Sequence, residues 1–165
     1  MADELVHKDI SPLPPTDDEQ DALLLLSMKV DEEISRPFRY VVDLLSHDHE
    51  IDPLKLLGES MTVVVHDRHR ERFFDGLVRS FTFLGISSGY AHYRAVLRPW
   101  FWFLHRTSNC RIFQELSVTE IFEKVAKDTH GFSDYRLALS ATYDPRVYCV
   151  QYRETDFNFV SRLLE

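Results

Sequence analysis

Two histidines and two acidic residues stand together at His47-Asp48-His49-Glu50. On an extended chain, His47 and His49 point to one side, and imidazole nitrogens are common zinc ligands. Asp48 would then point away, and the spacing provides no third ligand. Because the tract comes directly before Ile51-Asp52-Pro53, we interpret it as a solvated polar turn. A small metal-dependent hydrolase using His47, His49 and Glu50 is the alternative function. The same reasoning applies to His66-Asp67-Arg68-His69.

A nucleophilic thiol is the second chemistry that the residue types allow. Cys149 would need His130 as a base, with Asp128 or Asp144 to orient it. However, Cys149 lies in an apolar stretch without a neighbouring base or cation to lower its pKa. We therefore expect Cys110 and Cys149 to be reduced, partly buried thiols. The sequence also lacks G-x-S-x-G, H-E-x-x-H and a glycine-rich phosphate loop, so it indicates no active site.

The residues Trp100-Phe101-Trp102-Phe103 form a continuous aromatic run after Pro99. One face of a strand cannot bury so many large consecutive side chains. They therefore belong either to the core where two domains meet or to a subunit interface, in which aromatic residues are enriched. The sequence does not separate these two interpretations.

The final twenty residues predict a short strand, Arg146–Tyr152, followed by a helix that begins at Glu154-Thr155-Asp156. The acidic residues suit the positive end of a helix, and Arg153, Glu154, Asp156 and Arg162 are predicted to form an ion-pair network. The helical pattern continues to Glu165 without a C-terminal cap. We therefore expect this chain to be part of a longer protein.

Composition limits the classes of partner. The chain has 165 residues, a net charge of −8, 44% hydrophobic residues and 13% aromatic residues. The acidic balance argues against nucleic acid and anionic membranes as general partners, because both require clustered Lys and Arg. We recognise no membrane span and no signal peptide, so cytoplasmic synthesis is expected.

Hydrophobic patterning predicts a β-rich α+β fold in two parts. The first, residues 1–112, is expected to be a small split β-barrel, in which residues 1–21 are a partly mobile acidic and Pro-rich segment. A capping box at Ser117-Val-Thr-Glu120 then starts a helix that runs to about Asp128. Residues 113–165 are expected to begin a second, α+β subdomain. The predicted strands are Leu5–Ile10, Ala22–Val30, Phe38–Ser46, Met61–His66, Phe73–Phe83, Tyr90–Arg98, Tyr135–Leu139 and Val147–Tyr152.

The C-terminal segment carries a family resemblance. Residues 148–165, Y-C-V-Q-Y-R-E-T-D-F-N-F-V-S-R-L-L-E, resemble the signature of VgrG, the valine-glycine repeat spike protein of type VI secretion systems, which is related to phage tail hubs. Further matching segments occur in the same order at Glu33–Phe38, Leu54–Gly58, Phe74–Leu77, Tyr93–Trp102 and Arg111–Gln114. The sequence departs from the family pattern at Asp75, where His is usual, and in a lengthened acidic turn at Thr16–Asp21.

The resemblance implies a structural role without catalysis or a cofactor. In this family the hub is a homotrimer that adapts the hexameric Hcp tube to a C-terminal needle, which carries effector proteins into target cells. The resemblance makes Gln151 and Tyr152, with the aromatic run and the charged residues of the last helix, candidates for interface or structural roles. A phage or prophage tail hub is the related alternative. A monomeric ligand-binding barrel remains as another.

Overall fold

The computed structural model describes residues 7–12, 23–67 and 70–165 of the chain. It divides into two compact units, Met1–Pro99 and Trp100–Glu165. The division comes earlier than the boundary expected at residue 113. Phe113 lies within a strand that pairs with a later strand of the second unit, so the chain around it belongs to that unit. The proposed mobile segment lies mostly outside the described residues.

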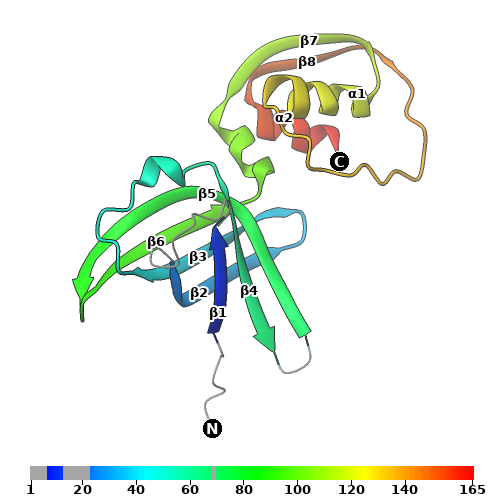
Figure 1. Cartoon of the computed structure of the whole chain (residues 1–165). Helices are drawn as coiled ribbons and strands as arrows, with labels where there is room; N and C mark the ends of the chain where they lie inside the picture. Colours follow the sequence, from blue (N-terminus) through cyan, green and yellow to red (C-terminus); the bar gives the residue numbers. More distant parts are fainter. Residues whose placement is uncertain (1–6, 13–22, 68–69) are drawn as a thin grey trace. The chain divides into compact units, whose positions relative to one another are not determined.

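The first unit is a single antiparallel sheet. Its strand order is β1-β4-β5-β6-β3-β2, and the end strands β1 and β2 approach each other, so the sheet curls into a half-barrel (Figure 1). This confirms the expected β-rich, split-barrel fold. The strands are β1 (His7–Pro12), β2 (Leu24–Glu33), β3 (Arg36–Ser46), β4 (Ser60–Asp67), β5 (Arg70–Ser87) and β6 (Tyr90–Arg98).

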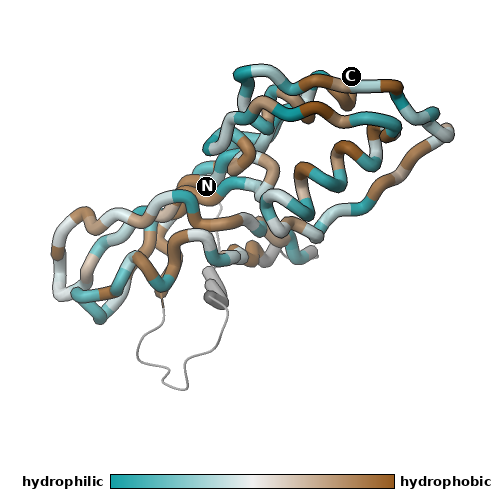
Figure 2. Tube along the Cα trace, turned by 90° about the horizontal axis from the view of Figure 1, so that it is seen from above, coloured by the Kyte–Doolittle hydropathy of each residue, from teal (hydrophilic) through white to brown (hydrophobic). Residues whose placement is uncertain are grey.

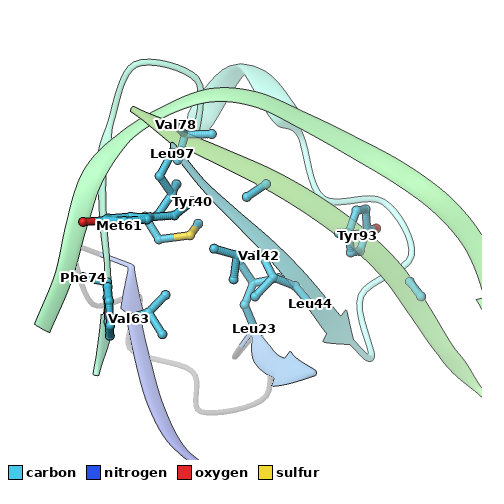
Figure 3. Close-up of a cluster of buried hydrophobic side chains, with 12 residues drawn as sticks. Leu23, Tyr40, Val42, Leu44, Met61, Val63, Phe74, Val78, Tyr93 and Leu97 are labelled. Atoms are coloured by element: carbon cyan, nitrogen blue, oxygen red, sulfur yellow. The ribbon is translucent and has the colours of Figure 1, made fainter. Parts of the chain in front are cut away.

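Alternating side chains build the core of this unit. In β3, Tyr40, Val42 and Leu44 are buried, while the residues between them are only half-buried. Figure 3 shows these side chains converging with those of the facing strands. The core comprises Leu23, Tyr40, Val42, Leu44, Met61, Val63, Phe74, Val78, Ala91, Tyr93, Ala95 and Leu97. Removal of this apolar surface from water is the main contribution to the unit's stability.

Gly76 in β5 permits a close approach between parts of the sheet. A Cβ added there would lie 3.1 Å from Phe38 Cε2 and 3.2 Å from the carbonyl oxygen of Arg98. A glycine inside a strand often marks either a bulge or a close approach of backbone, and at Gly76 it is the close approach. The register shifts in the β5–β6 pair come later, at Val78/Ser80 and Phe83/Gly85.

Gly76→Ala is expected to destabilise the chain by about 1–3 kcal/mol, because the added methyl group overpacks a site that includes backbone. Chemical denaturation followed by tryptophan fluorescence and circular dichroism measures the change. Thr82→Ala, at an exposed position of the same strand, serves as the control and should change stability by no more than about 0.5 kcal/mol. Equal stability of the Gly76→Ala variant and the unmodified chain would contradict the packing argument.

The second unit is a two-stranded ribbon with helices on one face. Strand β7 (Ser108–Leu116) pairs antiparallel with β8 (Arg146–Thr155). The helices α1 (Val118–Glu123) and α2 (Asp156–Leu163) lie on the same side of this ribbon (Figure 1). A 3-10 helix, η3 (Trp100–Arg106), precedes β7. The tube in Figure 2 shows the apolar and polar residues that alternate along the chain.

Helix α1 (Val118–Glu123) begins at the predicted capping box. The Ser117 hydroxyl accepts from the Glu120 amide, and the Glu120 carboxylate accepts from the Ser117 amide at 2.8 Å. The helix then widens into a π-helix, η4 (Lys124–Thr129). Such wide turns are rare in proteins and concentrate at positions with a special requirement. Here the turn delivers Thr129 and His130 to a buried carboxylate.

Helix α2 (Asp156–Leu163) begins one residue after its N-cap, Thr155, whose hydroxyl accepts from the Asn158 amide at 3.1 Å. Its inward face contributes Phe159, Val160 and Leu163 to the second core. Between η4 and β8, residues 132–145 form no strand, so the strand predicted at Tyr135–Leu139 is wrong. Side chains hold this segment instead: Trp100 Nε1 donates to the Asp134 carbonyl oxygen at 3.1 Å, and Phe132 and Tyr135 pack on the core.

Candidate functional site

The most highly connected polar group in the described chain is the carboxylate of Asp156, which is fully buried at the start of α2. Gln151 Nε2 donates to it at 2.7 Å, and Thr107 Oγ1 donates at 2.8 Å. His130 Nε2 lies 2.7 Å from Asp156 Oδ2, the oxygen that also accepts from Thr107. We call Asp156 and its side-chain partners the Asp156 cluster; the partners are Thr107, Asn109, Arg111, His130 and Gln151.

Several structural elements of the second unit contribute to this cluster. Strand β7 supplies Arg111. Thr107 lies directly before that strand, and its carbonyl oxygen accepts a hydrogen bond from the Asp156 amide at 3.0 Å. Strand β8 supplies Gln151, which is itself fully buried. Arg111 links three elements, because its Nε donates to Gln151 Oε1 at 2.9 Å and its Nη1 donates to Thr129 Oγ1 at 2.8 Å. The cluster therefore ties the ribbon, the π-helix and α2 together.

The hydrogen bonds keep Asp156 ionised despite its burial. Burial alone would raise the pKa of this carboxyl group, but donors from Gln151, His130, Thr107 and Asn109 outweigh that effect and hold its pKa at about 2. Since an ionised carboxylate only accepts hydrogen bonds, His130 Nε2 carries the proton in this contact. Arg111 supplies a positive charge opposite.

This arrangement predicts a loss of stability in acid. The folded pKa of Asp156, about 2, lies below the ordinary value of 3.8, so its ionised form stabilises the fold above pH 3.8. That contribution, roughly 2 kcal/mol, is lost as the pH falls from 3.8 toward 2. Urea unfolding over this pH range, compared between the unmodified chain and Asp156→Asn, isolates the effect from other carboxyl groups. The same acid loss in both proteins would contradict it.

The Asp156 cluster does not have the geometry of a catalytic triad. Thr107 Oγ1 and Asp156 Oδ2 both lie next to His130 Nε2, at 3.3 and 2.7 Å. A relay needs the acid on one ring nitrogen and the nucleophile on the other. The Thr107 hydroxyl also donates to the carboxylate, so His130 does not activate it. The chemistry of this cluster is therefore structural: it fixes the position of α2 on the ribbon.

The histidine tract, residues 47–50, follows strand β3 and forms neither strand nor helix, at the position where the sequence predicted a polar turn. His47 packs its ring against Tyr90 with 4.4 Å between ring centroids, and Asp48 Oδ1 accepts from the Glu50 amide at 2.7 Å. Across the described ranges, no group of three or more His, Cys, Asp or Glu side chains is placed to hold a metal ion. The side chains of residues 66–69 lie outside the described part.

The two thiols have different environments. Cys149 is buried in the core of the second unit, as expected, whereas Cys110 is exposed, and neither is in a disulfide. His130, which the sequence suggested as a base for Cys149, is paired with Asp156 and not with Asp128 or Asp144.

The four charged residues around α2 do not form the single ion-pair network that the sequence predicted. Arg162 Nη2 contacts Glu154 Oε1 at 2.6 Å, while the Arg153 guanidinium lies 5.3 Å from the centre of the Tyr152 ring.

The aromatic run forms the 3-10 helix η3 and belongs to the second unit. Trp100 and Phe101 pack against its core, and Leu104 is fully buried. Trp102 and Phe103 are half-buried.

The β7–β8 ribbon has one exposed and largely apolar face, which we call the ribbon face. Tyr152 lies on this face, opposite the face that carries the buried Gln151. The ribbon-face residues are Ile112, Tyr148, Val150 and Tyr152, with exposures of 67%, 66%, 38% and 65%.

Sequence reasoning named Gln151 and Asp156, and named His130 only as a base for Cys149, but it missed three of the residues that surround the carboxylate. Arg111 belongs to the segment Arg111–Gln114, which resembles the family, but the sequence did not identify Asp156 as its partner. Thr107 and Asn109 carry no local pattern, because the contacts link residues more than forty positions apart along the chain. The signal that was available is Arg111 directly before the apolar pair Ile112-Phe113, which indicates a partly buried cation that requires a partner.

Residues 31–165 match the phage tail baseplate hub family (GPD). The chain belongs to this family. The match begins near the end of β2 and includes β3 to β6 of the first unit and the whole of the second unit. No helix within the described ranges is long and apolar enough to cross a membrane.

The chain is also similar to characterised spike proteins of type VI secretion systems. The chain is 44% identical over 147 residues to the type VI secretion system spike protein VgrG1b of Pseudomonas aeruginosa, covering 88% of the chain and 20% of that protein. VgrG1c of the same organism is 41% identical over 98% of the chain. The chain therefore spans about a fifth of the length of these curated relatives.

A solved structure shows the same fold. The Escherichia coli c3393 protein, a component of the type VI secretion system, matches with a TM-score of 0.82 and 28% identity, over 95% of this chain and 42% of that one. That protein is described as structurally similar to the bacteriophage T4 tail proteins gp27 and gp5. The resemblance to VgrG spike proteins read from the sequence is thus confirmed.

Proposed function

We propose that this chain forms the hub of a type VI secretion spike, as a trimeric adaptor between the hexameric Hcp tube and a C-terminal needle that delivers effectors. The observation that carries the proposal is the hub-family match across residues 31–165, together with 44% identity to a spike protein of that secretion system. Partners in this account are two further copies of the chain, the tube protein, and tip or effector proteins.

The geometry of the site agrees with a mechanical role. The buried Asp156 cluster secures the second unit, and its hydroxyl and imidazole groups are engaged with one carboxylate. A rigid unit of this kind suits a part that transmits force. The ribbon face and the half-buried Trp102 and Phe103 supply apolar surface of the type found in subunit interfaces. In this account the protein is made in the bacterial cytoplasm and leaves the cell through the secretion system.

The mass of the natural full-length protein tests the proposal. Light scattering coupled to size exclusion should give the mass of a trimer for the whole protein. Tyr152→Ala combined with Ile112→Ala tests the ribbon face, with Leu54→Ala, exposed on the first unit, as the matched control. A full-length protein that remains monomeric at micromolar concentration would reject the trimeric adaptor.

A phage or prophage tail hub is a second candidate, because the matching family is a tail baseplate hub and the c3393 protein resembles phage T4 tail proteins. Both candidates predict a trimer, so the mass does not separate them. Binding to the Hcp tube protein encoded in the same genome favours the secretion spike. Binding to a phage tail tube protein alone favours the tail hub.

A further inference from the structure

The chain between η4 and β8 has the residue pattern of a strand. Its larger apolar side chains occupy alternate positions, with polar or small residues between them and Ala at position 141. These side chains are Tyr135, Leu137, Leu139 and Tyr143. Alternation over this length is typical of a strand with one buried face. In Figure 1 this part of the chain is the orange stretch that leads into β8, and it is drawn without an arrow.

Residues 136–145, which we call the unpaired segment, enter no ladder in the described chain. None of their backbone amide or carbonyl groups bonds to another backbone group of the described residues. Directly before them, the Tyr135 amide still donates to the Ser133 carbonyl oxygen at 3.0 Å. The unpaired segment therefore presents a continuous row of donors and acceptors that a further strand can satisfy.

The apolar side of the alternation is covered at its start and open further along. Tyr135 packs against Phe122, with 4.9 Å between the ring centroids. Leu137, Leu139 and Tyr143 are 37%, 49% and 44% exposed. The second unit thus anchors one end of this chain and leaves the apolar side chains beyond it without full cover. A strand beside the unpaired segment would bring its own apolar side chains against them.

The unpaired segment carries no charge between Arg136 and Asp144. Strands whose edge stays free in a folded protein usually carry charges or bulges, which prevent pairing with other molecules. Strand β2, at one end of the six-stranded sheet, has both features: it contains Lys29 and Asp31, and two register shifts interrupt its pairing. The central residues of the unpaired segment lack such charges, which indicates a permanent partner rather than one that binds and leaves.

The remainder of the same polypeptide is a partner that is always present. The chain covers 20% of VgrG1b and 42% of the c3393 protein, so both relatives have much more polypeptide outside the matched part. A strand tethered in the same chain has a high effective concentration, and its pairing does not depend on the concentration of the protein. We propose that the unpaired segment becomes a strand by pairing with a strand from the part of the full-length protein outside these 165 residues. That partner strand carries apolar residues at alternate positions, to pack against Leu137 and Leu139.

Hydrogen exchange resolved to single amides tests the pairing on the natural full-length protein. A strand beside one edge bonds every second amide of its neighbour. Every second amide between Leu137 and Tyr143 should therefore exchange at least about tenfold more slowly than in an unfolded chain, because exchange waits for local opening. The amides of β6, which is paired on both sides, provide the reference for full protection. Uniformly fast exchange from Leu137 to Tyr143 would overturn the proposal.

The Leu139→Ala variant tests the apolar side of the pairing. Loss of this side chain should speed the exchange of the protected amides by about tenfold. Thr142→Ala, which changes an exposed residue on the other side of the alternation, is the matched control and should leave their exchange unchanged. Unchanged exchange in β7 and β8 shows that the second unit stays folded in both variants. Equal exchange of the unpaired segment in the two variants would contradict the proposed packing.

Photo-crosslinking identifies the partner strand. Tyr143→benzoylphenylalanine places a reactive group on the apolar side of the unpaired segment. In full-length protein refolded from an equal mixture of unlabelled and nitrogen-15-labelled chains, the crosslinks should join this residue to a segment outside the 165 residues within one isotopic form. Crosslinks that combine both isotopic forms indicate a second copy and would reject the same-chain strand. The inference goes beyond the proposed hub function: a monomeric full-length protein contradicts the trimeric adaptor but leaves these expected results unchanged.

Discussion

The Asp156→Ala variant is expected to lose about 3–5 kcal/mol of stability. Removal of the carboxylate leaves the guanidinium of Arg111 and the side-chain amide of Gln151 without their shared acceptor. This is a large fraction of the stability of an ordinary domain. Denaturation followed by circular dichroism measures the loss. Hydrogen exchange should show that the faster-exchanging amides lie in β7, β8 and α2.

Glu154→Ala provides the matched control for this experiment. Glu154 lies two residues from Asp156, but its ion pair with Arg162 is partly exposed to solvent. Its removal should cost only about 0–1 kcal/mol. If Asp156→Ala were as mild as Glu154→Ala, the Asp156 cluster would not be the structural centre of the second unit.

The Phe159→Ala variant is expected to lose a similar amount, about 3–5 kcal/mol, through the cavity that it leaves. Phe159 is fully buried, and its ring stacks on Phe113 of β7 with 5.5 Å between centroids. The loss should appear in the unfolding free energy from a urea titration. Because the two side chains are in contact, the double variant Phe113→Ala, Phe159→Ala should lose less than the sum of the single losses.

Leu164→Ala controls for changes in helix α2 itself. Leu164 lies at the end of this helix and is 56% exposed, so its truncation should change stability by no more than about 0.5 kcal/mol. Strict additivity of the Phe113 and Phe159 losses would indicate that the two rings do not stabilise each other as the stacking suggests.

Local patterns predicted the elements that depend on near neighbours. The strand predicted at Tyr90–Arg98 has the bounds of β6, and the capping box at Ser117 starts a helix where expected. Both signals are contained in a few consecutive residues: alternation in one case, and paired hydroxyl and carboxylate groups in the other. The curled sheet followed from several such strands separated by short turns.

Features that depend on distant residues were not predicted. Strand β7 was missed because Arg111 points toward the Asp156 cluster, where alternation would place an apolar residue. The strand predicted at Tyr135–Leu139 has suitable alternation, but in the described structure its backbone enters no ladder and Tyr135 packs on Phe122 instead. The burial of Asp156 was also missed, because a carboxylate at a helix start is usually solvated. Its partners become evident only when β7, β8 and η4 are assembled.

The central claim is that the full-length protein adapts a trimer to a hexameric tube. Native mass spectrometry of that protein mixed with the purified Hcp ring measures the stoichiometry directly. The account predicts one complex with three copies of this protein on one hexameric ring. A complex with one copy for each ring subunit, or no complex with a correctly assembled ring, would contradict it.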